Sequence, residues 1–290
     1  MNISANADQI EFWNGPAGDK WVANQARIDR QIGPFGAIAI AVLGPGAGER
    51  VLEIGCGCGT ASLQIATAVA PGGTVTGLDI SAPMLARARA VAAEKGIDNV
   101  EFIHGDAAAY DFEAAAYDAV FSRFGVMFFA DPAAAFRHIR GALKAGGRLA
   151  FVCWQGLPDN PWAALPMAAV GRFIELPPAP PPGTPGPFAF GDRERLANIL
   201  GKAGFTGVAI EDIRRDVVLG DDLAEAVAYA TELGPASRLL ADADEPTKEA
   251  VRVALGKELG PATGGEAVTL PAAVWLVTAR NRIAPGVSVK

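Results

Sequence analysis

The stretch Val51-Leu-Glu-Ile-Gly-Cys-Gly-Cys-Gly-Thr60 decides the fold of this chain. An apolar run that contains one carboxylate, Glu53, leads into glycines at positions 55, 57 and 59. Glycines at a turn let the backbone approach a ligand closely. Open α/β sheets bind their ligands at turns that lead from a strand into a helix. The stretch therefore predicts a strand, a tight binding loop and a helix.

The glycine spacing separates this loop from two better-known nucleotide loops. The dinucleotide fingerprint is G-x-G-x-x-G, whereas here the third glycine, Gly59, arrives one residue early. The Gly-Lys-Ser/Thr ending of a phosphate-binding loop is absent from the stretch as well. A nicotinamide-dependent oxidoreductase remains an alternative, which the displaced glycine disfavours.

Apolar runs alternate with helical patterns on both sides of this stretch. Strand patterns cover Arg50–Ile54, Thr74–Asp79, Val100–His104, Tyr117–Ser122, Arg148–Trp154, Phe205–Val218 and Ala272–Arg280. Helix patterns cover residues 8–31 with a break near Gly15-Pro16, Ala37–Leu43 after Pro34 and Gly36, Thr60–Val69, Ala82–Lys95, Pro132–Leu143, Ala163–Leu176, Asp192–Lys202, Asp221–Leu233 and Glu245–Glu258. Strands that alternate with helices predict an α/β, Rossmann-like doubly wound sheet with helices on both faces.

The alternation breaks after Trp154. Residues 177–187 are rich in proline and predict an extended loop rather than a helix or a paired strand. This loop is either a lid or a passive surface connection. We expect a helical cap at residues 1–44, a core at 45–155, a substrate-side insertion at 156–190 and the rest of the same α/β domain at 191–290.

Composition narrows the class of protein. The chain has 290 residues, of which 50% are hydrophobic, and its charges give 25 − 32 = −7. An acidic chain without a cluster of Lys or Arg predicts no nucleic-acid partner. No apolar run of about 20 residues and no signal pattern is seen, which predicts no membrane span and a cytoplasmic location. Three cysteines, two of them one residue apart, fit neither a disulfide framework nor a metal site.

Two aspartates follow neighbouring strands and suit an adenosine. Asp79 ends the second strand, where a carboxylate can accept hydrogen bonds from ribose hydroxyls. Asp106 follows the third strand, and with the backbone N–H of Ala107 it can meet the adenine edge, while Ile80 and Met84 offer apolar surface to the adenine faces. The alternative role for both aspartates is capping of a helix N-terminus.

The motifs Glu53–Gly59, Asp79, Gly105-Asp106, Tyr117–Ser122 and Leu143–Ala150 stand in one order and spacing over roughly residues 45–155. In these residues the chain resembles class I S-adenosylmethionine-dependent methyltransferases, closest to the ubiquinone- and menaquinone-biosynthesis type. The resemblance implies a seven-stranded sheet, mostly parallel with an antiparallel last strand, in which Phe205–Val218 and Ala272–Arg280 form the last hairpin. Glu53 and Cys58 are mild departures from the family pattern.

The resemblance also implies which residues hold the cofactor, S-adenosyl-L-methionine. Glu53 and the glycine loop would approach the methionine moiety, Asp79 the ribose and Asp106 with Ala107 the adenine, and Ser122 and Arg123 would lie beside the sulfonium. The full set of expected cofactor residues is Trp21, Glu53, Gly55, Cys56, Gly57, Gly59, Asp79, Ile80, Met84, Asp106, Ala107 and Ser122. Cys56 is expected to act through its backbone.

Aromatic residues gather in the segments that can reach the methyl acceptor. Expected substrate residues are Trp13, Arg123, Phe124, Trp154, Asn160 and Trp162. Aromatic side chains suit an apolar or planar acceptor, although ordinary packing is the alternative. A buried arginine has an anionic partner, so Arg123 would meet the methionine carboxylate, a substrate carboxylate or a structural acid.

No catalytic base is assigned. His104 is expected to be structural, and His138 is expected to face solvent from the middle of a helix. The sequence therefore predicts a small-molecule methyltransferase, with a cofactor-binding protein of non-methylating, regulatory role as the alternative. It does not decide the acceptor atom or the choice between monomer and homodimer.

Overall fold

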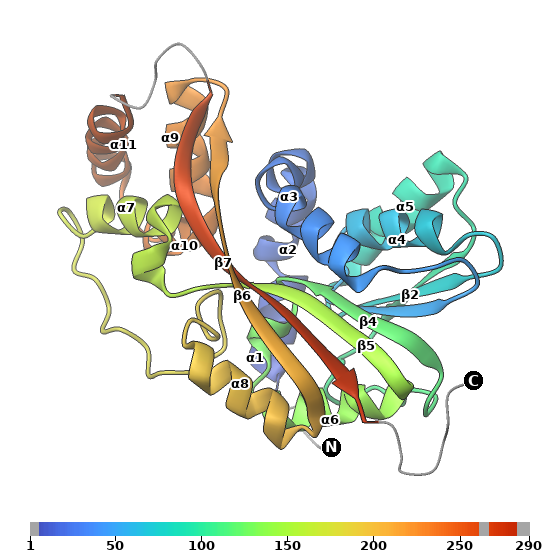
Figure 1. Ribbon diagram of the computed structural model, residues 1–290. Helices are drawn as coiled ribbons and strands as arrows, with labels where there is room; N and C mark the ends of the chain where they lie inside the picture. The colour runs from blue at the N-terminus through green and yellow to red at the C-terminus, as the bar shows by residue number, and fades with distance from the viewer. Residues whose placement is uncertain (1–5, 261–266, 283–290) are drawn as a thin grey trace. The chain divides into compact units, whose positions relative to one another are not determined.

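The computed structural model describes residues 6–260 and 267–282 (Figure 1). The chain divides into two compact units. The first comprises Met1–Trp154, Gly183–Asp212 and Trp275–Lys290, and the second comprises Gln155–Pro182 and Ile213–Val274. The strands β6 and β7 belong partly to each unit.

Seven strands form one sheet in the order β3-β2-β1-β4-β5-β7-β6. The strands are β1 (Arg50–Ile54), β2 (Thr74–Asp79), β3 (Val100–His104), β4 (Tyr117–Arg123), β5 (Leu143–Trp154), β6 (Phe205–Gly220) and β7 (Val268–Asn281). The first five strands pair in parallel, and β7 runs antiparallel to β5. The predicted α/β, seven-stranded, mostly parallel fold is thereby confirmed.

Helices cover both faces of this sheet in the first unit. They are α1 (Ala7–Asn14), α2 (Pro16–Ala23), α3 (Gln25–Leu43), α4 (Thr60–Val69), α5 (Ala82–Lys95), the short η1 (Val126–Phe128), α6 (Pro132–Ala142) and α8 (Arg193–Lys202). In Figure 1, α3, α4 and α5 lie on one side of the sheet, and α6 and α8 lie on the other. Asp131 and Asp192 cap α6 and α8 by accepting hydrogen bonds from the N–H groups of Ala134 and Arg195.

The helix α3 corrects the prediction of a chain break at Pro34. It runs unbroken through this proline, although an interior proline removes a backbone hydrogen bond. Its buried face, which includes Ile28, Ile32, Phe35 and Ala39, repeats every three or four residues. Burial of this apolar stripe stabilises the helix more than the proline disrupts it, as is usual when tertiary packing rather than local propensity decides a helix.

Further boundaries differ from the prediction, and β7, for instance, begins at Val268 rather than Ala272. Strand β5 begins at Leu143 rather than Arg148, because Gly146 and Gly147 form a register irregularity inside the strand, with φ of 77° at Gly146. The helix expected at Ala163–Leu176 ends at Val170. A short helix that the sequence analysis did not predict, α10, begins at Gly234, between the two helices expected at Asp221–Leu233 and Glu245–Glu258.

The second unit is mainly helical. Its elements are η2 (Leu157–Asp159), α7 (Pro161–Val170), α9 (Leu223–Glu232), α10 (Gly234–Leu239) and α11 (Glu245–Leu259), together with parts of β6 and β7. Ala169, Val170, Ala230, Val251 and Leu255 are among the residues of its buried core. The proline-rich residues 177–187, most of which lie in this unit, form neither helix nor strand, as predicted.

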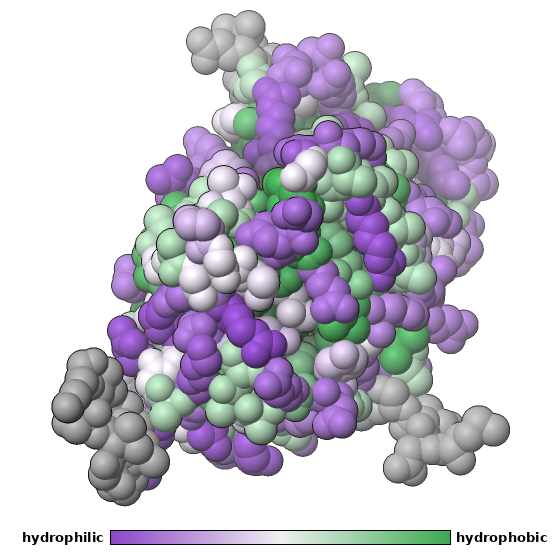
Figure 2. Space-filling view, turned by 90° about the vertical axis from the view of Figure 1, so that its right-hand side faces the viewer, coloured by the Kyte–Doolittle hydropathy of each residue, from purple (hydrophilic) through white to green (hydrophobic). Residues whose placement is uncertain are grey.

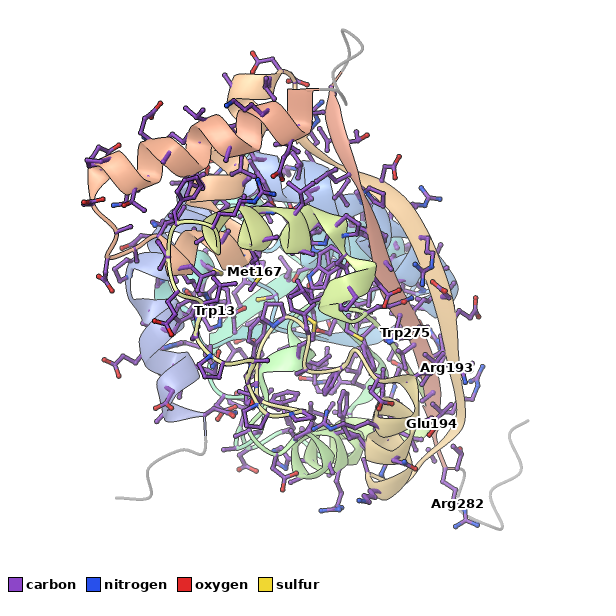
Figure 3. The ribbon with its side chains drawn as sticks, turned by 90° about the vertical axis from the view of Figure 1, so that its left-hand side faces the viewer. Trp13, Met167, Arg193, Glu194, Trp275 and Arg282 are labelled. Carbon is purple, nitrogen blue, oxygen red and sulfur yellow. The ribbon has the colours of Figure 1, made fainter. Side chains whose placement is uncertain are left out.

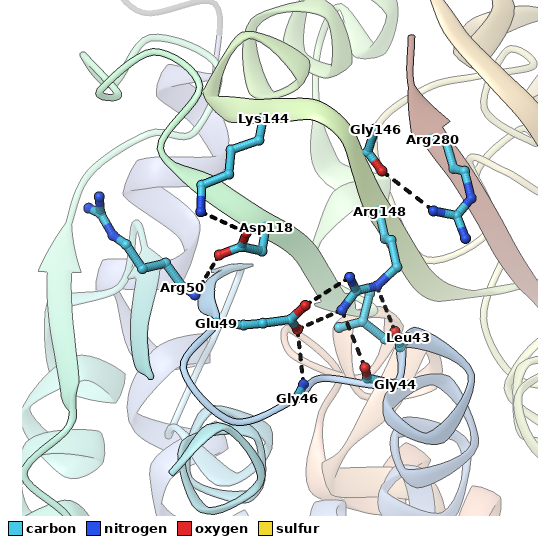
Figure 4. Close-up of polar contacts among 10 residues, drawn as sticks. All are labelled: Leu43, Gly44, Gly46, Glu49, Arg50, Asp118, Lys144, Gly146, Arg148 and Arg280. Atoms are coloured by element: carbon cyan, nitrogen blue, oxygen red, sulfur yellow. Dashed lines mark hydrogen bonds and ion pairs between the residues drawn. The ribbon is translucent and has the colours of Figure 1, made fainter. Parts of the chain in front are cut away.

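A polar cluster holds the amino ends of the central strands (Figure 4). Arg148 binds both carboxylate oxygens of Glu49, at 3.0 and 2.6 Å, and donates to the carbonyl of Leu43 at 2.9 Å. Asp118 accepts from the backbone of Arg50 and from the amine of Lys144. These bonds tie the end of α3, the loop before β1, and β4 and β5 together at the edge opposite the glycine loop.

The surface in Figure 2 shows hydrophilic residues interspersed with pale and apolar ones over the face in view. Among the described residues, no helix is long and apolar enough to cross a membrane.

Candidate functional site

The loop between β1 and α4 has a backbone that glycine favours. Gly55, Gly57 and Gly59 have φ values of 68°, 54° and 81°, in the left-handed region that other residues rarely adopt. A Cβ atom on Gly55 would lie 2.7 Å from the Cα of Gly125. The loop after β1 and the loop after β4 therefore pack backbone against backbone, and a side chain at position 55 would push them apart.

Asp79 lies at the carboxyl end of β2 and faces this loop. Its two carboxylate oxygens accept hydrogen bonds from the N–H groups of Gly57 (2.7 Å) and Ser81 (2.8 Å). Burial raises the pKa of this carboxyl, while the backbone hydrogen bonds act in the opposite direction. Ser81, not Asp79, is the N-cap residue of α5. A carboxylate has about four lone-pair sites, so Asp79 retains capacity for ligand hydroxyls.

Asp106 follows β3 and contacts the start of the described chain. Both of its carboxylate oxygens accept from the side-chain amide of Asn6, at 2.9 and 3.0 Å, and one also accepts from the N–H of Ala108. The amide oxygen of Asn6 accepts from the N–H of Ala130 at 2.9 Å. A turn, not a helix, follows Asp106, so its carboxylate does not cap a helix. The neighbouring Ala107 is buried.

Glu53 is a buried carboxyl group at the same edge of the sheet. It is 1% exposed, and its carboxylate accepts a hydrogen bond from the hydroxyl of Ser62. Burial raises the pKa of Glu53 from 4.5 to about 8, although the Ser62 bond and the charge of Arg123 lower it. Ser122 lies in β4, which pairs with β1 in the sheet, and its hydroxyl donates to the carbonyl of Ile54 at 2.7 Å.

The open side of the glycine loop faces apolar side chains. A Cβ atom on Gly57 would lie 3.7 Å from the Met84 sulfur and 4.0 Å from the indole nitrogen of Trp21. The backbone carbonyl of Ile80 accepts from Asn14 at 2.7 Å and lies 2.9 Å from the ring nitrogen of His104. Trp21 of α2 and Met84 of α5 therefore lie beside the glycine loop, although these three segments are distant in the sequence.

The helices α1 and α2 contact the start of α5. The carbonyl of Trp13, labelled in Figure 3, accepts from the Ser81 hydroxyl at 2.7 Å, and Asn14 accepts from the N–H of Ala82 at 2.9 Å. The ring of Trp13 meets those of Trp21 and Phe128 edge-on, each with 5.5 Å between ring centres. An aromatic cluster therefore lies beside the segment that carries Asp79.

The end of β4 supplies Arg123 and Phe124. Arg123 pairs with Asp29 of α3 at 2.9 Å, so a structural acid is one of its partners, while contact with a methionine or substrate carboxylate stays a prediction. Phe124 has a φ of 60°, unusual for a residue with a side chain. Its ring stacks on that of Trp154, with 4.4 Å between centres and 25° between planes. Both rings are buried.

Asn160 and Trp162 lie in the second unit, where they contact each other. The buried Asn160 side chain accepts from the indole N–H of Trp162 at 3.0 Å and from the N–H of Ala273 at 3.0 Å. It donates to the carbonyl of Gly156 at 3.0 Å. Within that unit these bonds link α7 to β7, and a role in substrate binding stays a prediction for both residues.

The two loop cysteines are buried and ionise poorly. Cys56 packs in the apolar cluster formed by α4, α5 and β3, and burial raises the pKa of its thiol. Burial raises the pKa of Cys58 to about 12. Within residues 6–260 and 267–282, no cluster of His, Cys, Asp and Glu could hold a metal ion.

Sequence reasoning missed Asn6, Asn14 and Asp29. Each binds a residue at the candidate site: Asn6 binds Asp106, Asn14 binds Ile80, and Asp29 binds Arg123. All three lie in the amino-terminal segment, where no motif distinguishes them from other polar residues. Asn14 precedes the Gly15-Pro16 helix break, the one local signal that marks any of them.

Comparison with known proteins identifies the class of protein to which this chain belongs. A family profile described as "Methyltransferase domain" matches residues 51–147. Nocamycin O-methyltransferase of Saccharothrix syringae is 31% identical over 264 residues, which cover 87% of this chain and 92% of that protein. Demethylmenaquinone methyltransferase of Listeria monocytogenes is 37% identical over 105 residues, or 36% of this chain and 44% of that protein.

A solved structure shares the fold. Phosphoethanolamine N-methyltransferase 2 of Haemonchus contortus, in complex with phosphomonomethylethanolamine and S-adenosylhomocysteine, aligns with a TM-score of 0.59 at 19% identity. The alignment covers 97% of this chain and 61% of that chain. The chain belongs to the class I S-adenosylmethionine-dependent methyltransferases, as the motifs indicated.

S-adenosylmethionine is the cofactor of this family. The residues present suit it, because the turn at Gly57 carries no side chain and opens toward Met84 and Trp21. Buried carboxyl groups stand at the ends of β1 and β2, where hydroxyl and ammonium groups would find acceptors.

Proposed function

We propose that this methyltransferase acts on a small, apolar or aromatic molecule that accepts the methyl group on an oxygen. The observation that carries the methyltransferase part of the proposal is the strand register, which sets Glu53, the glycine loop and Asp79 at one edge of the sheet, where the cofactor would bind. The nocamycin O-methyltransferase likeness, which extends over most of both chains, supports an oxygen acceptor.

The bound cofactor supplies a methyl group on a sulfonium, and transfer is an in-line displacement by the acceptor. The chain's own residues provide proximity and orientation, which account for much of the acceleration in such reactions. Asp79 would accept from the ribose hydroxyls, Asp106 and Ala107 would hold the adenine edge, and Ile80 and Met84 would contact its faces. Glu53 and the glycine loop hold the amino-acid end.

The aromatic residues support an apolar or planar acceptor. Trp13 and Trp21 meet edge-on beside the start of α5, and Phe124 stacks on Trp154 at the ends of β4 and β5. Aromatic walls with few polar groups suit planar organic ligands. In this proposal residues 1–44 form a cap, and residues 156–190 form a substrate-side insertion with Asn160 and Trp162.

The described part of the chain supplies no obvious general base. His104 and His138 are exposed, and each ring lies within hydrogen-bond distance of a backbone carbonyl, of Ile80 and Tyr110 respectively. An acidic hydroxyl, such as the enol of a 1,3-dicarbonyl compound, is largely ionised near neutral pH without a base, whereas an ordinary phenol, with a pKa of about 10, is not. We therefore propose an acceptor of this kind, with its proton released to solvent and the methyl group forming an ether bond to oxygen as the carbon–sulfur bond breaks.

Calorimetry with S-adenosylhomocysteine tests the cofactor site. We expect Asp79→Ala and Gly57→Val each to weaken binding at least about tenfold, since each change removes charge-assisted or backbone contacts worth roughly 1.5 kcal/mol or more. Cys58→Ala is the matched control in the same loop and should bind within about threefold of the parent protein. Absence of binding to the parent protein would refute the proposal.

Turnover with methyl-labelled S-adenosylmethionine and a panel of phenols and enols tests the acceptor. Label in an ether product supports the proposed reaction. Tight cofactor binding without transfer to any acceptor would instead favour a regulatory, non-methylating role.

A further inference from the structure

Asp29, near the amino end of α3, joins two segments that flank the glycine loop. One carboxylate oxygen accepts from the hydroxyl of Thr60 at 2.6 Å. The other pairs with the guanidinium of Arg123 at 2.9 Å. Thr60 is the first residue of α4, directly after Gly59, and Arg123 is the last residue of β4. Asp29 therefore fixes both side chains with one carboxylate.

Two further side chains extend this contact. The side-chain amide of Gln25 donates to the Thr60 hydroxyl at 3.1 Å, and its oxygen accepts from Arg87 at 3.1 Å. Gln25 and Asp29 lie four residues apart on α3, so they are on the same face of that helix. The face of α3 toward the first turn of α4 is thus a continuous polar contact rather than ordinary apolar packing.

Arg123 is confined on its other side. Its side chain is 11% exposed, and a Cβ atom on Gly36 would lie 2.7 Å from its Cδ. Bare backbone at position 36 gives the arginine stem the room to pass along α3. A guanidinium carries five N–H donors in a fixed fork. The ion pair with Asp29 engages one terminal nitrogen, Nη2, so the guanidinium has donors beyond this pair with which to meet a second anion.

We propose that Asp29 is a positioning residue, which orients Arg123 to receive the carboxylate of the cofactor's amino-acid end. The inference rests on the proposed cofactor site. The hydrogen bond between Asp29 and Thr60 holds the Arg123 guanidinium beside the glycine loop, because Thr60 directly follows Gly59. The N-terminus of α4 adds a partial positive charge that also favours a carboxylate there. Asp29 itself would not touch the ligand.

Paired ligands test this inference. S-adenosylhomocysteine carries the amino-acid carboxylate, whereas 5′-methylthioadenosine has the same nucleoside without it. We expect Asp29→Ala and Asp29→Asn to weaken S-adenosylhomocysteine about tenfold or more in calorimetry, the loss expected for a misplaced charge-assisted hydrogen bond. Binding of 5′-methylthioadenosine should change less than about threefold. Asp29→Glu retains the charge and should recover part of the lost affinity.

Asp19→Asn, on an exposed position of α2, is the matched control and should leave both affinities unchanged. Equal weakening of both ligands by the Asp29 variants would overturn the inference, because that is the result of a structural role. Unchanged affinity for both ligands would overturn it too. Failure of the parent protein to bind either ligand would instead refute the cofactor site, so the two failures are distinguishable.

Discussion

At the scale of single residues, the raised pKa of Glu53 leads to a prediction about how the free energy of unfolding depends on pH. Its pKa is about 8 in the folded protein, against 4.5 for a solvated carboxyl, chiefly because of burial. Between these values the folded protein binds a proton that the unfolded chain releases. The free energy of unfolding contributed by Glu53 is therefore fully present below about pH 4.5 and falls as the pH rises through about 8.

Glu53→Gln removes this titration. We expect the variant to gain stability relative to the parent protein between about pH 5 and about pH 8.5, by up to a few kcal/mol, because one pKa unit corresponds to about 1.4 kcal/mol. Urea denaturation at several pH values measures the difference. Glu113→Gln, at a side chain that is 69% exposed, is the control and should follow the parent curve. Parallel curves for all three proteins would contradict the expectation.

The sequence predicted those site residues that lie next to a motif. It missed the residues that contact the site from a distant part of the chain. Asp79 and Asp106 could be placed because each directly follows an apolar strand. Asn6 could not, since it meets Asp106 across a separation of 100 residues. The sequence left three possible partners for Arg123. The structure gives Asp29, an acidic residue that no motif distinguishes from others on the polar face of a helix. Such pairings depend on how helices dock, which local pattern does not encode.

At the scale of elements, boundaries were most predictable where periodicity and end signals agree. The helices α4 and α5 and the strands β2 and β3 have the predicted limits. Gly96, with a φ of 63°, is the C-cap of α5, and a glycine in this conformation commonly ends a helix. The prediction failed at α3, because a buried apolar face outweighed Pro34, and at β5, because Gly146 forms an irregularity within a strand. In both cases packing against neighbouring elements outweighed the local signal.

The Arg148–Glu49 ion pair leads to a prediction about how much the contact between β5 and the loop before β1 stabilises the fold. The pair is bidentate and three-quarters buried, and the Arg148 hydrogen bond holds the pKa of Glu49 below its usual value. We expect Glu49→Gln to lower the free energy of unfolding by about 1 to 3 kcal/mol, because Arg148 then loses its charged partner. Urea denaturation near neutral pH measures this loss.

The sign of the pH effect follows from the lowered pKa. The stabilisation from Glu49 is present above the ordinary carboxyl pKa and is lost as the pH falls through the lowered value, so the variant and the parent should converge in acid. Glu113→Gln breaks an exposed pair with Arg50 and should cost less than about 0.5 kcal/mol. Equal costs for the two variants would show that the bidentate geometry contributes nothing.

At the scale of the whole molecule, the end of α1 contacts the segment that follows Asp79 through backbone and amide groups. Asn14 joins the end of α1 to the carbonyl of Ile80 and the N–H of Ala82, and the carbonyl of Trp13 accepts from Ser81. Order in α1 and α2 is therefore coupled to the segment that follows Asp79. A ligand that orders this segment should also order the two helices, and the reverse must hold by linkage.

Asn14→Ala tests this coupling. The variant loses both side-chain bonds to residues 80 and 82, so we expect about three- to tenfold weaker S-adenosylhomocysteine binding. In the parent protein, ligand at about 100 times its Kd should stabilise the fold by about 2.7 kcal/mol, and hydrogen exchange in α1 and α2 should slow. In the variant this protection should be reduced in α1 and α2 but retained in α4. Asp8→Asn, at an exposed position of α1, should behave as the parent. Unchanged protection of α1 and α2 in the Asn14 variant would show that these helices are ordered independently of the cofactor site.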